Sequence, residues 1–456
     1  MGGCVAVLLL HVSDTHLGAT RPGNLREREM GFYEAFNEVV DIAKISSSKP
    51  CQVKILATIA WKSGDSIILR DVSGLREFKI KGSVGREILR LPCETSIYVE
   101  GLVEGDYLEV NKYEVIYPSK LECCETDAED VREYAFNYHM YVGRPRCFKV
   151  IRTISILSYL IRNALIFEGF TELQPPILGW KSDPGLRGAS KVKVSLYGSE
   201  YELHSSLIMY KQIYASIFEK IFYFARNIRV EPAENFYTGR HLVEFTQVDV
   251  EEAFTSMQES ISLAESILKK VVKEFLNNHA DLLDSSRIEW LDRTFLTEKY
   301  PVITYEEAVD LLTQHGFELR RGCELPHNAE AFLGEYYGTP VWLTGFPSTA
   351  RGFYYIENAE KPGYNVDWNL IVPEGHGEVL DGGCREYRVE ELEKRIKSTG
   401  ENPSEYQWFL DIVSKGYVKP TCGWGLGLER LVKTFHGLAH VGFATPHPRL
   451  PGVIGP

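Results

Sequence analysis

A glycine-patterned stretch near the carboxyl end, "TCGWGLGLERLVKTF" at residues 421–435, constrains the fold more than any other part of the sequence. Gly423, Gly425 and Gly427 alternate with larger residues, and Glu429 and Arg430 follow shortly after. Because glycine has no Cβ, a backbone built in this way approaches a ligand closely. The pattern therefore predicts a ligand site that this backbone borders and that Arg430 lines.

Two upstream stretches complete a larger pattern. "IRTISILSYLIRNALIFEGFTELQPPIL" has the periodicity of a long amphipathic helix that runs into a short strand, and core packing alone would explain it. "KIFYFARNIRVE" and "VEFTQVDVEEAF" flank a polar loop, "PAENFYTGRHL". In this order the three stretches resemble motifs 1, 2 and 3 of class II aminoacyl-tRNA synthetases. "GRHLVEFTQVDVE" and "GEVLDGGCRE" are similar to the aspartyl/asparaginyl branch of that family.

The resemblance implies an α+β fold for residues 148–456, in which helices surround an antiparallel sheet. Residues 50–117 have a different pattern, since apolar and β-branched residues alternate with polar ones in five short segments. That pattern predicts a small OB-like β-barrel, which either binds single-stranded nucleic acid or is purely structural. Residues 118–147 are predicted to link the barrel to the catalytic domain.

The amino-terminal residues 7–44 resemble the first βα unit of a metallophosphoesterase repair nuclease. "HVSDTHLG" supplies Asp14 and His16 in the Asp-x-His form of a metal site after an apolar run. A two-metal centre needs several further ligands. The chain has no Gly-Asn-His segment, and Gly64-Asp65 is the only Gly-Asp pair nearby. We therefore predict that residues 1–46 form a βα fragment without catalytic metal.

Composition limits the class of protein. The net charge of −13 argues against a generally basic surface that binds nucleic acid by phosphate neutralisation alone. The nine cysteines include no Cys-x-x-Cys pair, so a zinc site or redox dithiol has weak support. Their odd number in a long chain suggests a reducing interior, and we expect a cytoplasmic protein. The apolar run Val5–Leu10 is too short to span a bilayer, so no membrane association is expected.

The family resemblance assigns roles to individual residues. It implies that Arg229 and Arg430 are the catalytic arginines, because activation of a carboxylate by ATP passes through a negatively charged transition state. It implies Mg²⁺ as the second cofactor, bound by Glu378 and Glu251. The implied ATP-binding set is Arg229, Glu231, Arg240, His241, Phe245, Glu378 and Arg430. Surface ion pairs and core aromatic packing are the alternatives for these side chains.

The implied amino-acid pocket contains Lys211, Asp249 and Arg385. Lys211 matches a lysine that aspartyl-tRNA synthetases use on the substrate side-chain carboxylate, and Arg385 matches its arginine partner. Two cations fit a dicarboxylic acid better than an amide, since a second buried cation facing a neutral group would lack a counter-charge. Aspartate is therefore the predicted substrate.

Several positions depart from the family pattern. Ile208 stands where the family has a glutamine, and the loop "SDPGLRGAS" lacks the glutamate that usually contacts the α-amino group. The barrel also lacks evident anticodon-reading residues, although Trp61, Lys62 and Arg70 could contact RNA.

These departures lead to the functional prediction. We expect a ligase that forms aspartyl-adenylate and transfers the aspartyl group to ammonia, as in the archaeal-type asparagine synthetases that this chain resembles. The alternative is charging of tRNA with aspartate or asparagine, and a third hypothesis is a non-enzymatic or nuclease-linked binding protein. A homodimer is expected through the apolar helix near residues 151–168.

Overall fold

The structure, a computed structural model, describes residues 39–45, 49–121, 127–181, 189–453 and 455. The chain forms two compact units. The first comprises the described residues up to Glu129 together with His139–Phe148, and the second comprises Asp130–Tyr138 and the residues from Lys149 onward. Asp14, His16 and most of the predicted metallophosphoesterase-like fragment lie outside the described residues.

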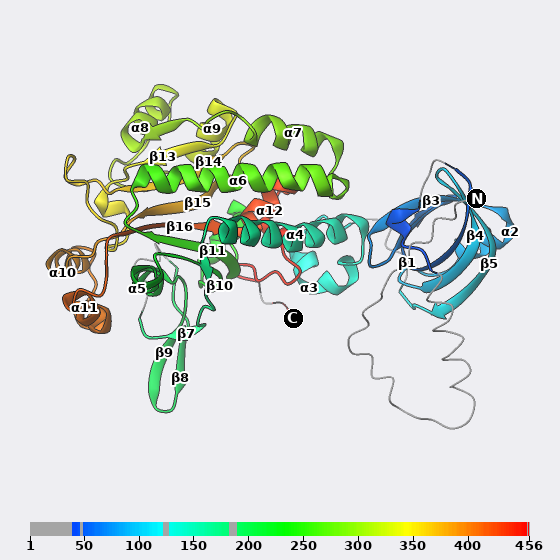
Figure 1. The fold of residues 1–456 in the computed structure, drawn as a ribbon, viewed down its shortest axis with the longest axis horizontal. Helices are drawn as coiled ribbons and strands as arrows, with labels where there is room; N and C mark the ends of the chain where they lie inside the picture. Colours follow the sequence, from blue (N-terminus) through cyan, green and yellow to red (C-terminus); the bar gives the residue numbers. More distant parts are fainter. Residues whose placement is uncertain (1–38, 46–48, 122–126, 182–188, 454, 456) are drawn as a thin grey trace. The chain divides into compact units, whose positions relative to one another are not determined.

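The first unit is a closed five-stranded barrel with strand order β1-β2-β3-β5-β4, drawn in blue to cyan in Figure 1. β3 pairs parallel with β5, and the other strand pairs are antiparallel. The predicted OB-like barrel is confirmed. Its elements are β1 (Cys51–Ser63), β2 (Ser66–Arg70), β3 (Leu75–Lys81), α2 (Gly82–Ile88), β4 (Ser96–Glu104) and β5 (Tyr107–Tyr117).

The segment before the barrel contributes to the barrel core. The short 3-10 helix η1 (Ile42–Lys44) places Ile42 fully inside, and Ile45 is also buried there. The Ile42 amide donates to Asp71 Oδ2 at 2.9 Å, which anchors the segment to the turn between β2 and β3. The described end of the predicted amino-terminal fragment is thus part of the barrel.

The second unit is built on an eight-stranded sheet with strand order β12-β13-β14-β15-β16-β11-β10-β6. Its central pairs are antiparallel, and only the outer pairs β12–β13 and β10–β6 are parallel among the described strands. The predicted α+β architecture with an antiparallel sheet is therefore confirmed. The strands are β6 (Thr171–Glu172), β10 (Lys220–Ile228), β11 (Glu244–Ala253), β12 (Val302–Thr304), β13 (Val341–Thr344), β14 (Asp367–Val372), β15 (Gly377–Cys384) and β16 (Thr421–Gly427).

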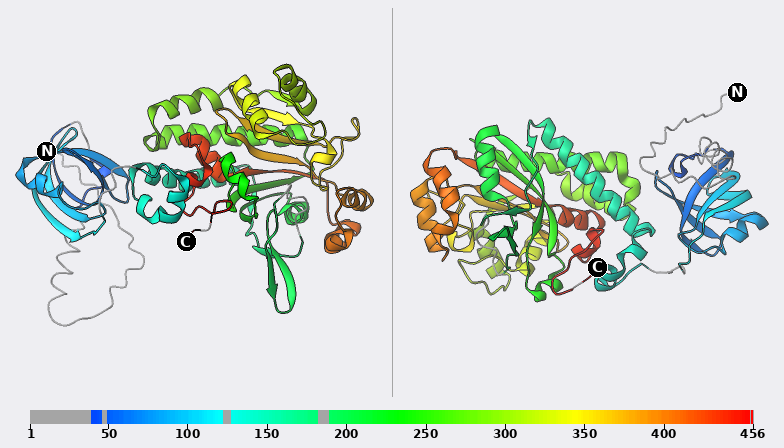
Figure 2. Two further views of the ribbon diagram at one scale, coloured as in Figure 1. Left: turned by 180° about the vertical axis from the view of Figure 1, so that it is seen from behind. Right: turned by 90° about the horizontal axis from the view of Figure 1, so that it is seen from below.

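Helices surround this sheet (Figures 1 and 2). They are α3 (Val131–Tyr141), α4 (Pro145–Phe167), α5 (Ile208–Phe218), α6 (Met257–His279), α7 (Ser285–Phe295), α8 (Tyr305–Gln314), α9 (His327–Tyr337), α10 (Val389–Ser398), α11 (Gln407–Ser414) and α12 (Leu428–His436). Short 3-10 helices are η2 (Ala233–Thr238), η3 (Ala280–Leu282), η4 (Ser348–Ala350), η5 (Pro403–Tyr406) and η6 (Val441–Ala444). A smaller sheet, β7 (Leu178–Gly179), β9 (Ser199–Leu203) and β8 (Lys193–Leu196), extends away from the main sheet in Figure 1.

The two faces of the central strands differ because side chains alternate along a strand. Val248 and Val250 of β11 are fully buried in the main hydrophobic core with residues of α4, α6 and α12. Gln247 and Asp249 have the opposite orientation and line a pocket. The helices α4, α6 and α12 therefore cover one face of these central strands, and the pocket lies on the other face, where α5 and α9 also supply lining residues.

Helix α4 is long and apolar enough to cross a membrane by length and composition alone. Its inward side chains, among them Leu157, Ile161 and Leu165, are fully buried in the core of the second unit. One side of the helix is therefore a core element, and core packing explains the apolar character of that side.

The described cysteines include a cross-strand disulfide. Cys384 at the end of β15 is bonded to Cys422 in β16, although the cysteine pattern had favoured a reducing interior. The two residues lie opposite each other in the strand pairing and are followed directly by Arg385 and Gly423. Cys51, Cys147 and Cys323 are free thiols.

Helix α6 begins at a capping box. Ser256 Oγ accepts from the Glu259 amide, and the Glu259 carboxylate accepts from the Ser256 amide at 2.9 Å. We expect Ser256→Ala to lower the free energy of unfolding by about 1 kcal/mol. Ser262→Ala, the same change at an exposed position inside the helix, should be neutral or slightly stabilising because alanine favours helices. Urea unfolding of both variants checks this, and equal effects would contradict the role of the cap.

Candidate active site

A pocket of about 460 Å³ lies at β11, β15 and β16. It is lined by every residue of the predicted ATP set, from Arg229 to Arg430, and by the predicted substrate residues Lys211, Asp249 and Arg385. Sequence positions more than two hundred residues apart are thus brought to one cavity. Glu251, predicted as a magnesium ligand, is not among the lining residues.

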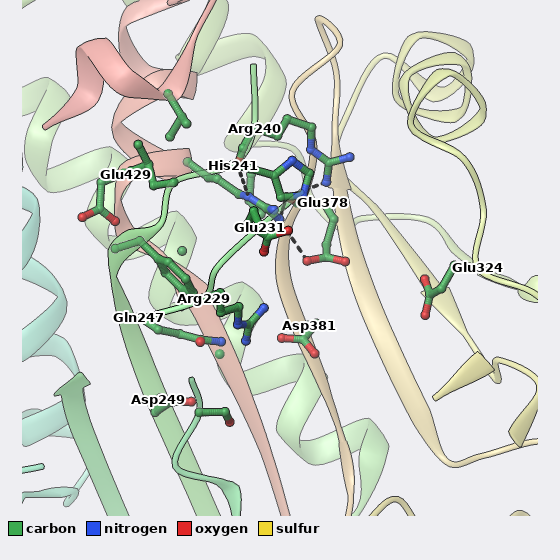
Figure 3. A pocket seen from close by; sticks show the side chains of 18 of the residues that line it. Arg229, Glu231, Arg240, His241, Gln247, Asp249, Glu324, Glu378, Asp381 and Glu429 are labelled. Carbon is green, nitrogen blue, oxygen red and sulfur yellow. Dashed lines mark hydrogen bonds and ion pairs between the residues drawn. The ribbon is translucent and has the colours of Figure 1, made fainter. Parts of the chain in front are cut away.

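The hairpin β10–β11 supplies one wall of the pocket (Figure 3). Arg229 follows directly after β10, its Nε donates to the Ser205 carbonyl at 3.1 Å, and its guanidinium lies 5.2 Å from the centre of the Phe245 ring. Glu231 Oε2 accepts from Asn235 at 2.8 Å. An arginine, an aromatic ring and a carboxylate are therefore held along one side of the cavity.

The floor of the pocket is backbone, as the glycine pattern predicted. Gly425 of β16 pairs on one side with Asp249 of β11 and on the other with Asp381 of β15. A Cβ at Gly425 would lie 1.9 Å from Gln247 Nε2. A side chain at Gly425 would therefore displace Gln247 and fill the space between Asp249 and Asp381.

A bulge sets the opposite wall. In the β14–β15 pairing, Leu370 faces Leu380 but Ile371 faces Glu378, so Val379 is an extra residue. A bulge re-aims the side chains around it. Glu378 and Asp381, three residues apart, consequently both line the pocket, which a regular strand with its two-residue period would not allow.

The end of the pocket near Glu378 contains two arginines, each paired with a carboxylate. Arg430 Nη1 donates to Glu378 Oε1 at 3.1 Å, and Arg240 Nη1 donates to the buried Glu330 at 2.7 Å. His241 lies between them, and its Nδ1 is 2.7 Å from Thr238 Oγ1. Burial, followed by the charges of Arg430 and Arg240, lowers the pKa of His241 to about 3, so the imidazole is neutral near pH 7. Two arginines and a neutral imidazole suit the oxygens of a polyphosphate.

The other end of the pocket lies against a buried quartet of charges. Lys211 Nζ donates to Asp249 Oδ1 at 2.9 Å, and Arg385 donates to both oxygens of Glu251 at 3.0 and 3.1 Å. Each side chain is 2% exposed or less, and two positive charges balance two negative ones. The structure therefore separates Glu251 from Glu378 and pairs it with Arg385, so we do not carry Glu251 into the magnesium site.

Glu378 fits a role as one magnesium ligand. Asn369 Nδ2 donates to Glu378 Oε2 at 3.0 Å, while Asn369 Oδ1 accepts from Arg351 at 2.8 Å. Asn369 orients the carboxylate but its own oxygen is occupied. No cluster of three or more His, Cys, Asp or Glu side chains suited to a metal occurs among the described residues. A single carboxylate that shares Mg²⁺ with substrate phosphates is a usual arrangement for this ion.

Sequence reasoning missed several pocket residues. Glu330 and His327 come from α9, about ninety residues after Arg240, with no local motif to signal their contact. Asp381 was missed because it lies three residues after Glu378, and a regular strand would place the two side chains on opposite faces. Part of the loop "SDPGLRGAS", whose missing glutamate was noted, lies outside the described residues.

Comparisons with known proteins agree with this geometry. The family model for class II tRNA synthetases (D, K and N) matches residues 131–451. An asparagine--tRNA ligase of Pyrococcus furiosus is 30% identical over 413 residues, covering 87% of this chain and 93% of that protein. An asparagine--tRNA ligase of Thermococcus gammatolerans is 29% identical, covering 86% of this chain and 92% of that protein. The crystal structure of asparaginyl-tRNA synthetase from Pyrococcus horikoshii complexed with asparaginyl-adenylate superposes with a TM-score of 0.78 and 26% identity. The match covers 92% of this chain and 100% of that chain.

Glu429 connects helix α12, which follows the glycine strand β16, to strand β11. It lies in the first turn of helix α12, is almost fully buried, and accepts from the Thr246 amide through both carboxylate oxygens, at 2.9 and 3.0 Å. Burial raises the pKa of Glu429 to about 7, although the bonds from Thr246 act in the opposite direction. Between pH 4.5 and 7 the unfolded chain has released this proton while the folded chain still holds it. Folding stability therefore falls as pH rises through this range.

Glu429→Gln removes this titration because glutamine is neutral at every pH. We expect the free energy of unfolding of the variant, relative to wild type, to rise by about 3 kcal/mol between pH 4.5 and pH 8. Urea unfolding at both pH values measures this difference. Glu393→Gln on the exposed side of α10 is the matched control and should show a constant difference. A constant difference for Glu429→Gln as well would contradict the raised pKa.

Proposed function

Because this chain belongs to the family of class II tRNA synthetases for D, K and N, we propose that it charges tRNA with asparagine through an asparaginyl-adenylate. It is an ATP-dependent ligase of this family. The proposal for the amino acid rests on one observation at the buried end of the pocket. Arg385 Nη1 and Asp249 Oδ2 are both buried there without a hydrogen-bond partner among the described residues.

One unpaired donor and one unpaired acceptor match a carboxamide. An asparagine side chain accepts through its oxygen and donates through its nitrogen, so it would satisfy Arg385 and Asp249 together. A carboxylate only accepts, so it would leave Asp249 Oδ2 unpaired and facing a like charge. The hydrogen-bonding capacity of this end of the pocket therefore favours asparagine.

In the structure the two cations do not require aspartate as the substrate. Lys211 and Arg385 were expected to need the substrate carboxylate as their counter-charge. In the structure Asp249 and Glu251 already supply both counter-charges within the protein. A further negative charge would make this buried group of side chains net negative, which low dielectric surroundings disfavour.

The remaining pocket residues suit adenylate formation. The α-carboxylate of the amino acid attacks the α-phosphorus of ATP, and pyrophosphate leaves. We assign Arg229 to the charge that develops at this phosphorus, and Arg240, His241 and Arg430 to the outer phosphates. We assign Phe245 to stacking on the adenine and Glu231 to accepting from its amino group. Mg²⁺, held by Glu378 and the phosphates, would supply further positive charge when bound.

We propose tRNA as the acceptor instead of ammonia. In the second step a terminal ribose hydroxyl of tRNA attacks the adenylate carbonyl, and AMP leaves. The named relatives and the retained barrel support this choice. Lys62 and Arg70, considered for RNA contact, donate to the Leu89 carbonyl and to Glu94 instead. Exposed candidates remain in Lys79, Lys81 and Tyr107, where basic and aromatic side chains adjoin as in many single-strand binding surfaces.

We also propose a homodimer. Strand β6 ends the main sheet, so one side of it has no partner strand among the described residues. Tyr159, Ile166 and Phe167 of α4 are exposed apolar side chains, with Phe167 77% exposed. A second copy that covers this edge would bury them.

Activity measurements test the function. We expect ATP–pyrophosphate exchange that depends on asparagine, weak or no exchange with aspartate, and acid-labile asparaginyl-tRNA when total tRNA is added. Arg229→Ala should lower the exchange rate about 100-fold or more, because it removes a cation from the transition state. Arg321→Ala is the control, since Arg321 pairs with Asp310 on the surface. Free asparagine formed from aspartate, ammonium and ATP would overturn the proposal.

Light scattering after gel filtration tests the dimer. We expect a mass near twice the 51.9 kDa of one chain for the wild type. The double variant Ile166→Asp, Phe167→Asp should have the mass of one chain, because a charge in an apolar interface is costly. Tyr417→Asp, at another exposed aromatic residue, should remain dimeric. A wild type with the mass of a single chain would refute the proposed dimer.

A further inference from the structure

We propose that Asp381 binds the α-ammonium group of the amino-acid substrate and thereby sets the requirement for an α-amino acid. This inference rests on the proposed function. Asp381 lies in β15, lines the pocket, and faces Gln247 and Asp249 across it (Figure 3). It has no counterpart among the site residues predicted from the sequence.

The substrate needs an anion that the assigned residues do not supply. If the α-carboxylate meets Arg229 and the side chain meets Arg385, the α-ammonium group lies between these two points. A cation that loses contact with water on binding is unfavourable unless it is paired and hydrogen-bonded. Ile208, which also lines the pocket, has no polar side-chain atom to offer.

Most carboxylates around the pocket are already paired with a cation. Asp249 pairs with Lys211, and Glu330 pairs with Arg240. Each of the remaining paired carboxylates has an arginine within 4 Å. The pairs are Glu324 with Arg351, Glu378 with Arg430, and Glu429 with Arg226. Among the described lining residues, only Glu231 and Asp381 make no ion pair. Glu231 lies on the β10–β11 hairpin at the proposed adenine end, which leaves Asp381 for the amino acid.

The strand pairing places Asp381 at a suitable position. Asp249, Gly425 and Asp381 form one row across three neighbouring strands. Two strand spacings put the Cα atoms of Asp249 and Asp381 about 10 Å apart. Gly425 between them has no side chain, so the α-carbon of a substrate can lie above it. From there the side chain would reach Asp249 on one side and the ammonium group would reach Asp381 on the other.

Asp381 is also held in place for this role. Tyr355 donates its hydroxyl hydrogen to Asp381 Oδ2 at 3.2 Å. Burial raises the pKa of Tyr355 well above its usual value, so this phenol stays protonated and remains a donor. Oδ1 of Asp381 has no hydrogen-bond partner among the described residues and is available to a substrate.

Pyrophosphate exchange with an analogue that lacks the α-amino group tests this inference. We would measure KM for asparagine, KM for ATP and the inhibition constant of succinamic acid, which is asparagine without that group. For Asp381→Asn we expect KM for asparagine to rise at least ~30-fold, as when one partner of a desolvated charge pair is removed. KM for ATP and the inhibition constant of succinamic acid should change less than about twofold, because neither ligand contacts Asp381 through an ammonium group.

Two further variants keep the result interpretable. Asp310→Asn removes a carboxylate from the exposed surface pair with Arg321 and should leave all three constants unchanged. Asp381→Ser is a second substitution at the same position. It replaces Asp381→Asn if that variant folds poorly, as judged by its Tm.

Each outcome decides between the two proposals. A parallel rise in KM for asparagine and in the inhibition constant of succinamic acid would show general damage to the pocket and overturn the role of Asp381. Unchanged constants would overturn it as well. If the wild type uses aspartate, the same comparison is made with aspartate and succinate. Absence of exchange with both amino acids in the wild type would instead refute the proposed function and this inference with it.

Discussion

The buried ion pairs Arg385–Glu251 and Lys211–Asp249 are the interaction on which the catalytic unit depends. Four charges are removed from water at the junction of β11, β15, β16 and α5. Desolvation of that kind is tolerated only when every charge is paired with good geometry. Removing one member would leave an unpaired charge in the core. The quartet therefore fixes the relative positions of three strands as well as the chemistry of the pocket end.

The same strands separate packing from chemistry by their two faces. Val248 and Val250 anchor β11 to the helical layer, and the residues between them face the ligand side. Glycines in β16 extend this division, because they give the central strand no side chain on the pocket face while Trp424 and Leu426 pack inward. A rigid core thus positions polar groups without those groups having to contribute to packing.

Linear sequence patterns predicted a large part of this arrangement. The glycine strand, the hairpin with Arg229 and the barrel were evident because each is encoded by neighbouring residues. Other features needed three-dimensional information. The bulge at Val379 brings Glu378 to the same face of β15 as Asp381, and Glu251 pairs with an arginine 134 positions away. The disulfide between Cys384 and Cys422 likewise depends on strand register that no spacing rule predicts.

The way the chain alternates between its two units limits its modularity. Residues 130–138 belong to the catalytic unit and residues 139–148 to the barrel unit, although they are consecutive. Tyr134 donates its hydroxyl hydrogen to the Thr445 carbonyl, at the other end of the catalytic unit's sequence. No single cut in this region yields two complete pieces, since a break before residue 130 takes 139–148 from the barrel unit and a break after 148 takes 130–138 from the catalytic unit. Recombination or gene fission at this boundary would therefore not separate the two units as complete domains.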